Sequence, residues 1–144
     1  MARFLIVDAH SIIFAWPELR ALHQRRMALA REALVQALTH YQDFSGVRVV
    51  AVFDGQGQRA ADAGEPGGVQ VIYSGQGETA DDVIERLVAR YGQEHEITVA
   101  TRDRLEAQTA STFGATCISP DFLWGMLGEA RAGFERDLKR HQRQ

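Results

Sequence analysis

Acidic residues stand at several points where an apolar run of the sequence ends. Asp8 closes the run LIVD, and Asp54 closes the run VVAVFD. Asp103 follows a further apolar run, ITVAT, while Asp81 lies in the segment ETADD. A buried carboxylate without a partner is costly, so Asp8 in particular should lie at an edge of the structure and have a partner.

The segments that carry these acids alternate between strand-like and helical patterns. Apolar, β-branched runs predict five strands, at residues 4–8, 47–54, 69–73, 97–101 and 115–119. Helical spacing predicts helices from Pro17 to about Gln42, from Thr79, from about Arg104 to Thr112, and from Pro120 into the tail. This alternation predicts an α/β fold, a three-layer α/β/α sandwich around a mainly parallel five-stranded sheet.

The composition indicates an ordinary globular protein. The 144 residues fit one domain, residues 1–144, with a charged helical tail at about 131–144. A net charge of −3 gives no overall attraction to nucleic acid, so any such binding must come from local basic patches. One cysteine rules out a disulfide framework within the chain. With no signal peptide and no membrane-spanning run, we expect a cytoplasmic location and no membrane partner.

The acids are expected to meet at one edge of the sheet. In a parallel sheet the carboxyl ends of all strands share an edge, and ligands bind there in open α/β folds. Clustered carboxylates repel one another, and oxygen ligands without a His or Cys cluster favour Mg²⁺ or Mn²⁺. One or two such ions can activate water and support cleavage of a phosphodiester. The expected acidic crevice contains Asp8, Asp54, Asp81 and Asp103, with Glu78 and Asp82 beside them.

Helix capping is the alternative explanation for some of these acids. Thr79 and Asp82 have the spacing of a capping box, and Asp103 with Glu106 has the spacing Asp-x-x-Glu. Acids in a first helical turn also complement the helix dipole. Asp8 and Asp54 have no such explanation, because both end strands.

Residues near the expected crevice are candidates for contact with substrate. His10 and Ser11 follow Asp8; the Ser11 hydroxyl suits a hydrogen bond to Asp8 or to a phosphate, or the completion of a turn. Arg102 and Arg104 flank Asp103 and are expected to contact phosphate. Residues 55–68 have no periodicity and predict a loop, in which Arg59 is expected to reach substrate phosphate.

The order of these motifs resembles the YacP-like branch of the NYN family. The opening segment LIVDAHSIIFAWPEL, residues 5–19, is similar to the family's first block. Residues 41–54, GETADD at 77–82, TVATRD at 98–103 and residues 114–119 are similar to the later blocks. The resemblance implies a PIN-like fold and metal-dependent cleavage of RNA. It also implies an acidic centre of Asp8, Asp54, Asp81 and Asp103, with Glu78 and Asp82 as neighbours.

The sequence departs from the family in the first block. Ala9, His10 and Ser11 stand where the family has Gly, Tyr and Asn. The change bears on substrate positioning more than on metal binding, because all four principal acids are present. The first hypothesis is therefore a metal-dependent endoribonuclease in which Asp8 and Asp103 hold metal, Asp81 holds or orients it, and Asp54 completes the site. The rivals are a non-catalytic RNA- or ribosome-binding module and a phosphotransfer enzyme; the absence of a phosphate-binding loop counts against the second.

Overall fold

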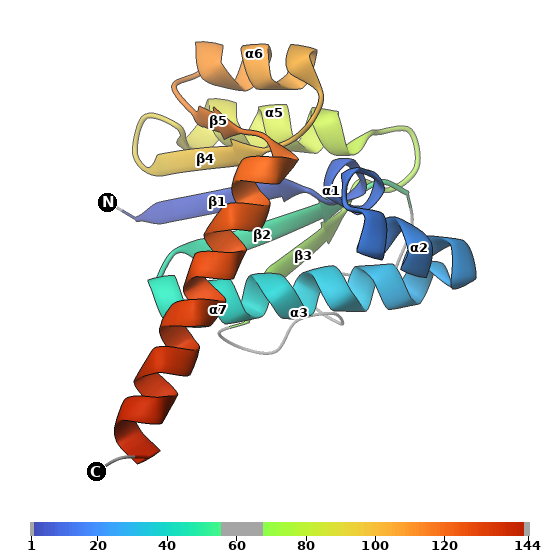
Figure 1. The fold of residues 1–144 in the computed structure, drawn as a ribbon. Helices are drawn as coiled ribbons and strands as arrows, with labels where there is room; N and C mark the ends of the chain where they lie inside the picture. Colours follow the sequence, from blue (N-terminus) through green and yellow to red (C-terminus); the bar gives the residue numbers. More distant parts are fainter. Residues whose placement is uncertain (1, 56–67, 143–144) are drawn as a thin grey trace.

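A computed structural model describes residues 2–55 and 68–142 and shows one parallel five-stranded sheet (Figure 1). Its strand order is β3-β2-β1-β4-β5, and every neighbouring pair is parallel. The strands are Arg3–Asp8 (β1), Arg48–Phe53 (β2), Gln70–Tyr73 (β3), Glu96–Ala100 (β4) and Thr116–Ile118 (β5). The predicted α/β/α sandwich is confirmed, with β1 at the centre of the sheet.

Successive side chains of the strands point to opposite faces of the sheet and pack into two separate hydrophobic cores, one on each face. Leu5 and Val7 of β1 join a core with helices α1, α2, α3 and α7, while Ile6 joins a core with α5 and α6. The strands are continuous apolar runs in the sequence because helices cover both faces of the sheet (Figure 1). Because all neighbouring strands are parallel, their carboxyl ends lie along one edge of the sheet. This is the edge at which the sequence predicts the site.

The segment after β1 differs from the prediction. In place of one helix from Pro17 to about Gln42, the chain forms Ala9–Ala15 (α1), Pro17–Arg25 (α2) and Met27–Ser45 (α3). Trp16 is extended because it precedes a proline, and Arg26 is extended with φ −163°. No element was predicted for residues 9–15, because α1 follows Asp8 directly with no turn between strand and helix.

The remaining helices follow the predicted pattern closely. They are Ala80–Tyr91 (α5), Arg104–Thr112 (α6) and Pro120–Gln142 (α7). The expected charged tail is helical through Gln142. The second half of α7, residues 131–142, extends away from the sheet (Figure 1). The Trp16 indole donates a hydrogen bond to the Pro120 carbonyl at 3.0 Å, which fixes the start of α7 against the first helices. No helix of the described ranges is long and apolar enough to cross a membrane.

Candidate active site

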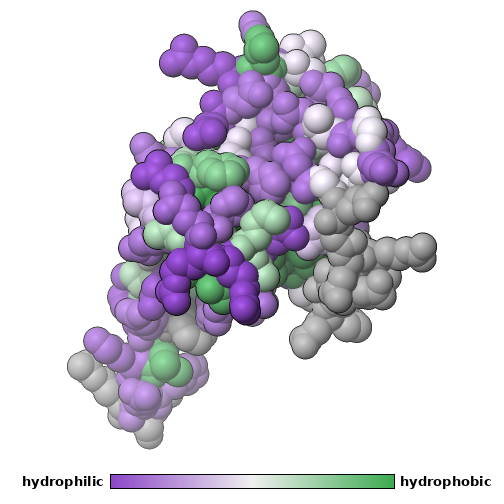
Figure 2. All heavy atoms as spheres, turned by 90° about the vertical axis from the view of Figure 1, so that its right-hand side faces the viewer, coloured by the Kyte–Doolittle hydropathy of each residue, from purple (hydrophilic) through white to green (hydrophobic). Residues whose placement is uncertain are grey.

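The four principal acids lie together at the carboxyl edge of the sheet. Asp8 ends β1, Asp54 directly follows β2, and Asp103 precedes the first residue of α6. Asp81 lies in the first turn of α5. Its pKa is raised, first by burial and then by the negative charges of Asp8, Asp103 and Asp54. The topology therefore brings together the residues that the sequence singled out. Figure 2 looks onto this edge, where hydrophilic residues cover most of the described surface.

The tightest part of the cluster includes a residue that the sequence reasoning assigned to a helix cap. Carboxylate oxygens of Asp8, Asp81 and Glu106 lie within 4.8 Å of one another. Asp8 and Glu106 are 5% and 2% exposed, so both carboxyl groups are withdrawn from solvent. Burial, followed by the carboxyl groups of Asp81 and Asp8, raises the pKa of Glu106 to about 10. Glu106 Oε1 is buried and has no hydrogen-bond partner.

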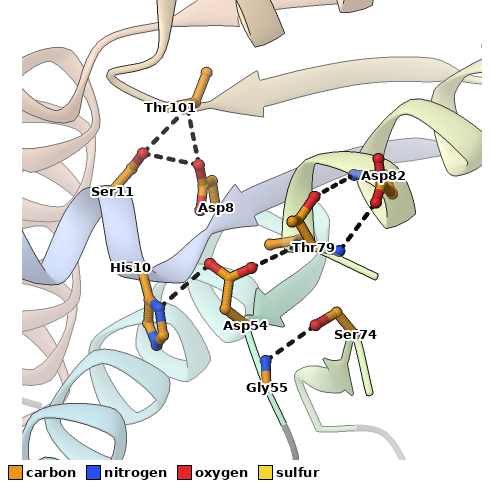
Figure 3. A network of polar contacts seen from close by, with 10 residues as sticks. Asp8, His10, Ser11, Asp54, Gly55, Ser74, Thr79, Asp82 and Thr101 are labelled. Atoms are coloured by element: carbon orange, nitrogen blue, oxygen red, sulfur yellow. Dashed lines mark hydrogen bonds and ion pairs between the residues drawn. The ribbon is translucent and has the colours of Figure 1, made fainter. Parts of the chain in front are cut away.

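Two hydroxyl groups, of Ser11 and Thr101, contact the same carboxylate oxygen of Asp8 (Figure 3). Ser11 Oγ donates to Asp8 Oδ2 at 2.8 Å, and Thr101 Oγ1 lies 3.0 Å from the same oxygen. Thr101 Oγ1 also lies 2.8 Å from Glu106 Oε2 and accepts from the Asp103 amide at 3.1 Å. One hydroxyl hydrogen cannot serve both carboxylates, so one of these contacts needs a proton on the carboxyl side. This agrees with the raised pKa of Glu106.

Asp54 is held by the start of α5 and by His10. Its Oδ1 accepts a hydrogen bond from the Ala80 amide at 2.6 Å, and its Oδ2 lies 3.3 Å from His10 Nδ1 (Figure 3). Burial lowers the pKa of His10, and the charge of Asp54 opposes that shift. His10 and Ser11, the two substrate candidates from the first block, thus each contact one acid of the site.

The capping explanation holds for two of the acids, Asp82 and Asp103, while a third, Glu78, forms an ion pair. Asp82 and Thr79 form a complete capping box at the start of α5. Asp103 Oδ1 accepts from the amides of Leu105 and Glu106, as the N-cap of α6. Glu78 pairs with Arg86 through contacts of 2.6 and 3.2 Å, and this hydrogen bonding lowers the pKa of Glu78. Glu78, Asp82 and Asp103 are outside the close group of three.

The predicted cations are not drawn into the acidic cluster. Arg102 and Arg104 are exposed and make no ion pair with another described residue. Arg59 lies outside the described residues. The role of these arginines in phosphate binding stays a prediction.

Thr101 and Glu106 are the two contributors that the sequence reasoning missed. Glu106 is the third residue of α6, a position at which a capping box accounts for an acid. The Asp103 amide, however, donates to Thr101 instead of Glu106, so the Glu106 side chain turns inward. The available signal was the pair itself: Thr101, a hydroxyl residue at the end of the predicted strand, lies five residues before Glu106, an acid in the first turn of a helix.

Comparison with known proteins places the chain in a family. Residues 5–144 match the YacP-like NYN domain, and a curated relative, YacP of Bacillus subtilis (strain 168), is 36% identical over 104 residues. This alignment covers 71% of the chain and 61% of the relative.

The fold agrees with crystal structures of the same relative. A mutant of Rae1 (YacP) from Bacillus subtilis superposes with a TM-score of 0.83 at 31% identity, covering 98% of this chain and 84% of that one. A second Rae1 (YacP) structure gives 0.80 at 31% identity, with coverage of 95% and 80%. The central β1, the acidic carboxyl edge and the sequence match agree: the chain belongs to the YacP-like NYN domain family, a family of PIN-like nucleases.

Proposed function

We propose that this protein is a metal-dependent endoribonuclease that hydrolyses RNA phosphodiester bonds at the acidic carboxyl edge. The observation that carries the proposal is the close group of Asp8, Asp81 and Glu106, contributed by β1, α5 and α6. Three separate elements place carboxylate oxygens within 4.8 Å, an arrangement that is unfavourable unless a proton or a cation reduces the negative charge. Family membership supports nuclease chemistry at this site.

The donor set fits a hard divalent cation. All three groups offer carboxylate oxygens, the ligands that Mg²⁺ and Mn²⁺ prefer in proteins. Glu106 Oε1 is buried without a hydrogen-bond partner, so this oxygen has a free lone pair to offer to an ion. Asp8, Asp81 and Glu106 would hold the ion directly, with Asp54 and Asp103 at its margin. A bound divalent ion supplies charge that activates water and stabilises phosphate oxygens during hydrolysis.

The surrounding side chains fix the acids in place. Ser11 and Thr101 orient the Asp8 carboxylate, and the Ala80 amide with His10 orients Asp54. Asp103 is the N-cap of α6, the helix that carries Glu106. Thr101 contacts the carboxyl groups of both Glu106 and Asp8. The departures from the family's first block are therefore compatible with catalysis, because His10 and Ser11 support acids of the site.

The proposal is tested with purified protein and circular RNA, which only an endonuclease can open. We expect cleavage with Mn²⁺ or Mg²⁺ and none in excess EDTA. Asp8→Asn should lower the rate about a hundredfold or more while preserving the fold, because Asn keeps the hydrogen-bond acceptor but not the charge. Glu96→Gln is the matched control, since Glu96 is exposed at the opposite end of the sheet.

The outcomes separate the two functions left open by the sequence. Binding of RNA without cleavage under any of these conditions would favour the non-catalytic RNA- or ribosome-binding module. Cleavage that survives both EDTA and Asp8→Asn would reject the proposed site. RNA as the partner, free or on the ribosome, and a cytoplasmic location stay predictions from the sequence.

A further inference from the structure

A basic segment lies beside the acidic edge. Between Pro17 and Glu32 the chain has four arginines against two glutamates, in a protein of net charge −3. Three of these arginines, Arg20, Arg25 and Arg26, are exposed, and none of the four makes an ion pair with another described residue. The segment forms α2 and the start of α3, which pack against α1, the helix that directly follows Asp8 (Figure 1).

Arg31 is the member of this segment that the fold holds in a defined position. Its guanidinium lies 5.5 Å from the ring centres of both Phe53 and Tyr73, and these rings stack on each other at 5.5 Å. Phe53 and Tyr73 are the last residues of β2 and β3, so Arg31 lies at the carboxyl edge. Its Nε is buried without a hydrogen-bond partner, although the side chain as a whole is only half-buried.

The position of Arg31 is next to the acids but not within their ion pairs. Burial lowers the pKa of His10 most, and the charge of Arg31 lowers it further. His10 lies 3.3 Å from Asp54 and packs edge-on against the Phe53 ring. The α5 side of the site differs, because Glu78 and Asp82 are there and Arg86 is already paired with Glu78. A polyanion approaching the edge therefore meets an unpaired cation on the α3 side and carboxylates on the α5 side.

We propose that Arg31 binds a phosphate of the RNA strand flanking the cleaved bond, and that the strand leaves the site over α2 and the start of α3. This inference rests on the proposed function, since it names how that site positions its substrate. The two rings attract the Arg31 guanidinium without using its N–H groups, and a guanidinium suits bidentate contact with phosphate. Arg20, Arg25 and Arg26 are the exposed cations of α2 and of its junction with α3 along this path.

The test compares two arginines that make the same kind of contact at opposite ends of the sheet. Arg48, the first residue of β2, lies 6.0 Å from the Phe4 ring. Arg31→Met and Arg48→Met each remove a charge and keep most of the volume. Binding of a labelled oligouridylate of about twelve nucleotides is measured in EDTA over a range of KCl concentrations, and cleavage is measured separately with Mn²⁺.

Arg31→Met should weaken binding about tenfold and reduce the slope of log K against log salt by about 0.7, while Arg48→Met leaves both unchanged. In cleavage, Arg31→Met should raise KM more than it lowers kcat. Arg31→Lys should restore the salt slope but only part of the affinity, which a purely structural role of Arg31 does not predict.

Equal binding and equal slopes for the two methionine variants would overturn the inference, as would a wild-type protein that binds no oligouridylate. The result is separable from the proposed function. RNA binding that depends on Arg31 without Mn²⁺-dependent cleavage would support Arg31 as a phosphate contact and reject the nuclease. Mn²⁺-dependent cleavage with RNA binding unaffected by Arg31→Met would reject that contact and support the nuclease.

Discussion

Glu106 shows how one residue can combine a structural cost with a functional use. Its carboxyl group is buried beside two others and has a pKa raised to about 10, so it is protonated near neutral pH without metal. A cation between the three acids would replace that proton with a stronger neutralising charge. Metal binding is therefore expected to release a proton from this residue.

The metal-free protein should lose stability as pH rises through this window. A carboxyl group whose pKa is higher in the folded than in the unfolded chain contributes stability below the unfolded value, 4.5, and loses it as pH rises toward about 10. The temperature at the midpoint of thermal unfolding in EDTA should therefore decrease as the pH is raised from about 6 to 9. Glu106→Gln, which resembles the protonated form, should flatten this dependence.

Mn²⁺ provides the complementary measurement. The stabilisation by Mn²⁺ should grow with pH in the wild-type protein, because deprotonation of Glu106 favours the metal-bound form. Glu106→Gln should show a much smaller Mn²⁺ effect at every pH. Identical pH profiles for the two proteins would show that another group controls the stability of the cluster.

At the scale of elements, the sequence predicted the strands well and the site partly. Continuous β-branched runs identified all five strands, since both faces of a parallel sheet are buried. Helix α1 was missed because no turn or breaker separates it from β1. Asp8, Asp54 and Asp81 were recognised from their strand ends or helix start, whereas Glu106 was not, because cap spacing is a local signal and inward rotation depends on the Asp103–Thr101 contact.

Thr101 joins three elements of the site and should be sensitive to loss of its hydroxyl group. Thr101→Val keeps the shape but removes the group that contacts Asp8, Ser11, Glu106 and the Asp103 amide. We expect a loss of about 1–3 kcal/mol in the free energy of unfolding, measured by urea denaturation in EDTA, and weaker Mn²⁺ binding.

Thr39→Val is the matched control for that substitution. The Thr39 hydroxyl is also partly buried, but it donates only to the Val35 carbonyl of its own helix. Its removal should have little effect on stability and none on Mn²⁺ binding. Equal losses in the two variants would mean that Thr101 acts as an ordinary hydroxyl residue and not as a connection between elements.

At the scale of the whole molecule, the acid cluster joins the two layers of helices through the central strand. Asp8 ends β1 beside α1, whereas Asp81 and Glu106 come from α5 and α6 on the opposite face. A cation held by all three would connect layers whose apolar cores are separate. Metal binding should consequently slow opening of elements on both faces.

Hydrogen exchange with and without Mn²⁺ measures this directly. The first turns of α5 and α6 and the amides of α1 should become more protected together. The second half of α7, residues 131–142, should not change, because it extends away from the sheet (Figure 1). Protection confined to α5 alone would contradict a site shared by three elements.

The central position of β1 also has a consequence for the order in which the chain is made. Among the described strands β1 comes first in the chain, yet both of its neighbours, β2 and β4, come later, and β4 begins at Glu96. Pairing across such sequence distances is slow to begin and waits for the later segments. Glu106, which completes the close acid group, lies in α6, the helix after β4. A nascent chain therefore has no complete acid cluster until synthesis has passed Glu106, and the proposed nuclease site is absent before that point.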